Sequence, residues 1–135
     1  MRAHIMPYWG NHKGLGLIAG IVMGLLCATL LFLPGLVHWL FQVESGAGTD
    51  VMSNRAAILF LGLSVLAFRS RAEAPSPLRN TIDLSLGLVM AGLLVVGLYH
   101  YVTGQVSHGI WLALGVEAFF ASAYLRFWRG GADLA

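Results

Sequence analysis

The run LGLIAGIVMGLLCATLLFLPGLVHWLF, residues 15–41, contains no Asp, Glu, Lys or Arg. A helix needs about 20 apolar residues to cross the hydrocarbon core of a bilayer, so this run is more than long enough for one span. Near its far end, Pro34 cannot donate a hydrogen bond to the carbonyl group of Leu30. We therefore expect a kink or tilt in this helix close to Pro34-Gly35.

Three more apolar runs follow, at about residues 51–69, 78–102 and 108–128. None shows the strict alternation of a barrel strand over its whole length. The connections between the runs are short, and short connections place neighbouring helices antiparallel. The sequence therefore predicts an all-α, polytopic membrane protein of one domain, residues 1–135, built as an antiparallel bundle of four transmembrane helices.

The composition agrees with a membrane protein. The chain is 10% charged and 58% hydrophobic, whereas about a quarter of a soluble domain is charged. A domain of 135 residues cannot hide so much apolar surface from water. The net charge of +2 comes without a basic stripe or a recognition motif, so nucleic acid is not an expected partner. The expected partners are the lipid bilayer and either another membrane protein or a second copy.

The basic residues predict the orientation. If both termini are cytoplasmic, only Arg55 among the eight basic residues lies outside. The excess of Lys and Arg in cytoplasmic segments is the usual determinant of membrane topology. The remaining basic residues then all lie on the cytoplasmic side: Arg2, Lys13, Arg69, Arg71, Arg79, Arg126 and Arg129.

Small residues recur every fourth position in the first run, at Gly16, Gly20, Gly24 and Ala28. Such a face lets another backbone approach closely, which favours helix association in lipid. One interpretation is packing inside the bundle. The other is a contact with a second copy or with another membrane protein.

Glu117 lies near the middle of the last run, between Ala113 and Ala121. A carboxylate at this depth is costly, so it must face the bundle or a cavity, be protonated, or find a partner. A proton relay, an ion site or a group that orients a polar ligand are the functional interpretations. The structural interpretation is a hydrogen-bonded glutamate that locks the last helix to its neighbours.

Two further charged residues complete a candidate buried polar or ion site with Glu117. Asp83 follows Arg79 by four residues, which favours a pair on one helix face, and we expect Asp83 to point inward. The helix N-terminus nearby also favours a carboxylate there. Arg55 could reach outward to the acidic residues of the first outer loop or inward to Glu117.

Histidines offer only a weak metal signal. His38, His100 and His108 all lie near the outer ends of the predicted helices, and neutral imidazole is a common ligand. They form no i, i+3 or i, i+4 pair, so we predict no metal site and no cofactor. His4 and His12 are assigned to the N-terminal tail as solvated polar residues.

The run NRAAILFLGL, residues 54–63, is followed by Arg69 and preceded by Leu33-Pro34-Gly35 in the first run. These elements resemble small four-helix bacterial membrane proteins, the DoxX-like families and neighbouring groups of uncharacterised function. The resemblance implies the fold and a bacterial cytoplasmic (inner) membrane. It implies no reaction, and no functional residue is carried over from it.

The sequence contains no phosphate-binding glycine loop, nucleophile elbow or HExxH metalloprotease motif. Three functional hypotheses remain, in order of preference. The first is a non-enzymatic accessory or assembly component of a membrane complex. The second is a small oligomeric transporter or proton-coupled carrier centred on Glu117. The third is a membrane enzyme acting on a lipid or quinone-like substrate.

Overall fold

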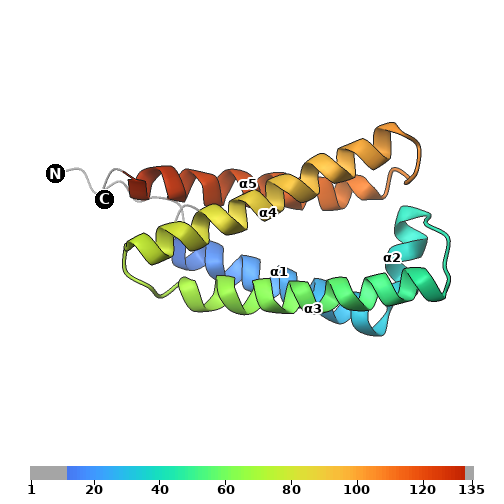
Figure 1. Cartoon of the computed structure of the whole chain (residues 1–135), viewed down its shortest axis with the longest axis horizontal. Helices are drawn as coiled ribbons and strands as arrows, with labels where there is room; N and C mark the ends of the chain where they lie inside the picture. The colour runs from blue at the N-terminus through green and yellow to red at the C-terminus, as the bar shows by residue number, and fades with distance from the viewer. Residues whose placement is uncertain (1–11, 133–135) are drawn as a thin grey trace.

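The computed structural model describes residues 12–132, which form helices and no strand (Figure 1). This confirms the predicted all-α fold. Four of the helices are long and apolar enough to cross a membrane, and the fifth is a short segment after the first span. The elements in chain order are α1 (His12–Phe32), α2 (Pro34–Phe41), α3 (Ala47–Ser70), α4 (Pro77–Val102) and α5 (Ile110–Ala132).

The four long helices run antiparallel, so their ends gather at two ends of the molecule. Figure 1 shows the starts of α1 and α4 beside the ends of α3 and α5. We call this the basic end, because most of the described basic residues belong to it, and we call the other the opposite end. The basic residues of the basic end are Lys13, Arg69, Arg71, Arg79, Arg126 and Arg129.

The first apolar run forms two helices, where the sequence predicts one helix with a kink. α1 ends at Phe32 and α2 begins at Pro34, with Leu33 between them at φ −133° and ψ 50°. The N–H group of Leu33 still donates to the carbonyl group of Thr29 at 2.8 Å. Pro34 has no N–H group to donate the next helical hydrogen bond, and in a continuous helix its ring would clash with the carbonyl group of Leu30. The helix axis therefore breaks, and α2 lies across the opposite end (Figure 1).

The long helices pack as two pairs, α1 with α3 and α4 with α5. The pairs share a core in the half of the bundle nearest the basic end, where buried side chains come from all four helices. A second cluster, Cys27, Leu30 and Ala57, belongs to the α1–α3 pair alone. The shared core consists of Leu15, Ala19, Met23, Ala67, Leu86, Met90, Phe120, Ala121 and Tyr124.

The two pairs meet again at the opposite end through backbone and hydroxyl groups. The N–H group of Ser107, in the connection between α4 and α5, donates to the carbonyl group of Phe41 at 2.9 Å. The Ser107 hydroxyl donates to the carbonyl group of Leu40 at 3.0 Å. These bonds attach the end of α2 to the α4–α5 pair.

Glycines set the distance between α1 and α3. A Cβ atom at Gly16 would lie 2.5 Å from the Cβ of Arg71 and 2.7 Å from the carbonyl oxygen of Ala67. At Gly20 it would lie 3.2 Å from the Cβ of Phe68. Real Cβ atoms do not approach so closely at Gly16, so a larger residue there would force the helices apart.

Gly24 lies on the same face, since a Cβ atom there would lie 3.3 Å from the Ser64 hydroxyl. Ala28, the fourth residue of the predicted small-residue face, is exposed. Gly16, Gly20 and Gly24 therefore contact α3 of the same chain. This geometry favours packing inside the bundle over an external contact for these three residues.

Candidate functional site

Asp83 is buried in the first turns of α4, near the basic end, with only 2% of its surface exposed. Its helix begins at Pro77, after Ser76, whose hydroxyl accepts a hydrogen bond from the N–H group of Arg79 at 3.2 Å. The Nε of Arg79 lies 3.9 Å from the Asp83 Oδ2, which is the pair that the spacing of four residues predicts. Asp83 therefore points into the bundle, one turn after its basic neighbour.

His12 is the closer partner of Asp83. Its Nε2 lies 2.7 Å from the Asp83 Oδ1, and His12 is 5% exposed. The imidazole also meets the Phe127 ring edge-on, with the ring centroids 5.2 Å apart. The hydrogen bond between His12 and Asp83 joins α1 of one helix pair to α4 of the other.

The placement of His12 corrects the sequence interpretation, which assigned it to a solvated tail. α1 begins at His12, three residues before the apolar run that defines the first span. Helix packing at the basic end covers this first turn, so a polar residue at the edge of the hydropathy signal becomes part of the core. The sequence carried no local signal for this, because the burial comes from the neighbouring helices. His4 lies outside the described residues.

The short distance between His12 and Asp83 indicates a strong interaction. An N···O separation near 2.7 Å is typical of a charge-assisted hydrogen bond. A carboxylate away from water is costly unless it is paired and hydrogen-bonded, and His12 and Arg79 supply those contacts. The pair can hold a proton between an imidazole nitrogen and a carboxylate oxygen inside the bundle.

Other polar atoms near this pair have unused hydrogen-bonding capacity. Among residues 12–132, the buried His12 Nδ1, Asn80 Oδ1 and Tyr124 hydroxyl have no hydrogen-bond partner. Tyr124 is fully buried, in the core that the four long helices share. Most buried polar groups in proteins are paired, so these atoms are unusual. We call His12, Arg79, Asn80, Asp83 and Tyr124 the polar cluster.

Glu117 lies elsewhere, along the contact between α4 and α5. A Cβ atom at Gly97 would lie 3.9 Å from the Glu117 Oε2, so the glutamate faces a position on α4 that has no side chain. The Oε2 atom is buried and has no hydrogen-bond partner among residues 12–132. Gly97 follows Asp83 by 14 residues, which is about 21 Å along the helix axis.

The structure does not bring Glu117, Arg55 and Asp83 together. Arg55 is exposed on α3, in the other helix pair, and no ion pair joins it to Glu117 in the described part of the chain. Asp83 belongs to the polar cluster at the basic end. The three residues that the sequence grouped as one candidate site therefore occupy three places.

The three histidines of the weak metal prediction also have separate partners. The Nε2 of His38 lies 2.9 Å from the Ser53 hydroxyl. The Nδ1 of His100 lies 2.7 Å from the Gln105 Oε1, at a local turn. The Nδ1 of His108 lies 2.8 Å from a tyrosine hydroxyl, that of Tyr101. No group of three His, Cys, Asp or Glu side chains within residues 12–132 could hold a metal ion.

His38 has a structural role that the sequence did not reveal. It is buried, and besides Ser53 its ring approaches the Ser45 hydroxyl at 3.4 Å and the Asp50 Oδ1 at 3.8 Å. These contacts attach α2 to the start of α3. The break at Pro34 makes them possible, because α2 turns back over the opposite end.

Comparison with known proteins gives no family for this chain. No family model matches it, and neither a curated protein nor a solved structure matches it. The resemblance to DoxX-like families stays a prediction, and the functional assignment rests on the geometry.

A double-mutant cycle on His12 and Asp83 tests their interaction. His12→Ala leaves a buried carboxylate with only the longer contact to Arg79, and we expect it to lower the free energy of unfolding by about 3 kcal/mol. Asp83→Leu removes the buried carboxylate and should cost less. The double variant should be more stable than the sum of the two losses predicts, with a coupling of about 1–3 kcal/mol.

The cycle is measured by reversible unfolding of the purified chain in mixed micelles. Arg79→Gln serves as the control, because its contact is long, and it should change stability less than His12→Ala. Additive losses, within about 0.5 kcal/mol, would show that His12 and Asp83 do not interact as described.

Proposed function

We propose that this chain is a non-enzymatic integral membrane protein that serves as an assembly or accessory component of a membrane complex. Its described helices are joined by short connections, which leave little chain outside the bilayer. The proposal places it in the bacterial inner membrane with the basic end in the cytoplasm. The distribution of basic residues supports this orientation, since Arg55 alone belongs to the opposite half among residues 12–132.

The outer face of α3 is the observation that carries this proposal. In the most apolar 18-residue stretch of α3 only 11% is buried, whereas in the corresponding stretch of α1 the buried share is 39%. The buried residues of α3 are small: Ser53, Ala57, Ala67 and Ser70. Phe60 and Leu63 pack against the shared core. The other large apolar residues of α3 are exposed: Val51, Met52, Ile58, Leu59, Leu61, Val65, Leu66 and Phe68.

Gly62 lies on this outer face of α3, and a Cβ atom there would meet nothing within 4 Å. A glycine on a membrane-facing surface lets another helix come close, as small residues do at helix interfaces in lipid. Gly62 therefore suits contact with a helix of another membrane protein. Inside the bundle, by contrast, polar side chains such as Asp83 and Ser64 form hydrogen bonds between helices of the same chain.

The α3 contact is tested by enlarging Gly62. Gly62→Trp should abolish recovery of a stoichiometric partner when the tagged chain is crosslinked in cells and purified in mild detergent. Gly92→Trp is the matched control, because Gly92 is an exposed glycine of α4 with nothing within 4 Å. Equal partner recovery in both variants would refute the contact, and recovery of a second copy alone would assign the face to self-association.

Glu117 favours a second candidate function, a proton-coupled carrier. A buried carboxylate oxygen without a hydrogen-bond partner among the described residues is a site where a proton or cation could bind. The enzyme hypothesis has no comparable support, because Glu117, Arg55 and the outer histidines lie in separate places.

The carrier hypothesis predicts that Glu117→Gln abolishes proton-driven flux in proteoliposomes, because the amide cannot exchange a proton. Glu73→Gln, in the exposed connection before α4, should keep the flux of the unmodified chain. Fluorescence of a trapped pH indicator reports the flux. A Glu117→Gln chain that transports protons at the original rate would exclude this function.

A further inference from the structure

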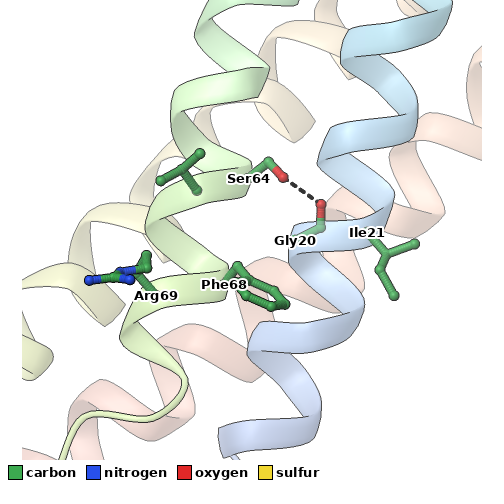
Figure 2. A pocket seen from close by; sticks show the side chains of 6 residues that line it. Gly20, Ile21, Ser64, Phe68 and Arg69 are labelled. Atoms are coloured by element: carbon green, nitrogen blue, oxygen red, sulfur yellow. Dashed lines mark hydrogen bonds between the residues drawn. The ribbon is translucent and has the colours of Figure 1, made fainter.

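A shallow groove runs along the outside of the α1–α3 pair, close to the basic end. Gly20 and Ile21 of α1 line it together with Ser64, Val65, Phe68 and Arg69 of α3. Figure 2 shows the Ser64 hydroxyl donating to the carbonyl group of Gly20, at 2.6 Å, and Phe68 pointing toward α1. This bond and the missing side chain at Gly20 hold the two helices close, and the exposed apolar residues of the groove include Ile21 and Val65.

Positive charge stands at the basic end of this groove. Arg69 lines the groove and is exposed, one residue before the end of α3. The Arg71 guanidinium lies over the Phe68 ring, with its Cζ 4.0 Å from the ring centroid. No carboxylate forms an ion pair with either arginine in the part of the chain that the structure describes. The groove thus ends in two cations that have no acidic partner there.

The depth of the groove matches the structure of a lipid. Ser64 and Arg69 are five residues apart, which is about 7.5 Å along the helix axis. The arginine end lies at the level of lipid headgroups if the basic end meets the cytoplasmic surface. The Gly20 and Ser64 end then lies at the level of the acyl chains, and exposed apolar residues of α3 continue beyond it.

We propose that this groove binds an anionic phospholipid, with one acyl chain along Gly20 and Val65 and the phosphate group on Arg69. Basic pockets between transmembrane helices on the cytoplasmic side are suited to anionic headgroups. Inorganic phosphate has no chain to fill the apolar part of the groove. A zwitterionic phospholipid brings a cationic group beside the arginines, which offsets the attraction of its phosphate.

Native mass spectrometry of the purified full chain tests this site. The detergent-solubilised chain is mixed with phosphatidylglycerol or phosphatidylcholine of identical acyl chains, and the retained lipid is counted. The chain should prefer phosphatidylglycerol. Arg69→Gln should lower that preference about fivefold, the effect of one arginine at an anionic headgroup. Arg129→Gln removes an exposed charge of α5 at the same end and should keep it.

A second pair of variants tests the apolar part of the groove. Val65→Trp fills it and should reduce retention of both lipids, whereas Val95→Trp on the exposed face of α4 should not. Equal retention of the two lipids by the unmodified chain would overturn the proposal, as would an unchanged preference in Arg69→Gln. Competition by inorganic phosphate or by the glycerophosphoglycerol headgroup at the lipid concentration would instead show a free-anion site.

Discussion

The hydrogen bond between His12 and Asp83 is the interaction on which the arrangement of this bundle depends. It joins the two helix pairs at the basic end with a separation of 2.7 Å between Nε2 and Oδ1. Apolar side chains choose weakly between a neighbouring helix and lipid tails, because both are equally apolar. A buried carboxylate is different, since leaving it without a partner is costly. The bond therefore selects which faces of the two pairs meet.

The rest of the packing agrees with this role. The core shared by all four long helices lies in the same half of the bundle as His12 and Asp83. Toward the opposite end the second cluster stays within the α1–α3 pair, and hydrogen bonds from Ser107 to α2 make the connection. The bundle is thus held by polar bonds at both ends and by close packing of the glycine face of α1 against α3.

Hydropathy was sufficient to predict the four spans and the antiparallel bundle, because each span must satisfy the same length and composition. It was not sufficient for the break at Leu33 or for the role of His12. The burial of His12 could have been predicted by comparing depths in the membrane. Asp83 lies near the start of one helix and is expected to point inward, and His12 lies near the start of another helix at the same end of the bundle. The prediction that Arg55 and Glu117 share a site was wrong because Arg55 is exposed on α3, which packs against α1, whereas Glu117 lies on α5, which packs against α4.

The account assigns each polar residue to a place, and this limits what the chain can do. The polar cluster and Glu117 both lie within the bundle, whereas Arg69 and Gly62 lie on the outer surface of α3. We propose that the internal positions serve assembly of the four helices or movement of a proton. The external positions are those we propose for contact with lipid or with another helix. The same helix, α3, thus provides both a packing face and a free face.

The distance between the two helix pairs at the basic end is the most direct measure of this account. Pulsed electron paramagnetic resonance in lipid nanodiscs would report this distance. The spin labels are placed at positions 69 and 126, in a chain whose Cys27 is replaced by Ala. The account predicts one narrow distance distribution, which broadens and shifts to longer distances in Asp83→Leu. A distribution that is unchanged by Asp83→Leu would show that the two pairs are held together without the His12–Asp83 bond.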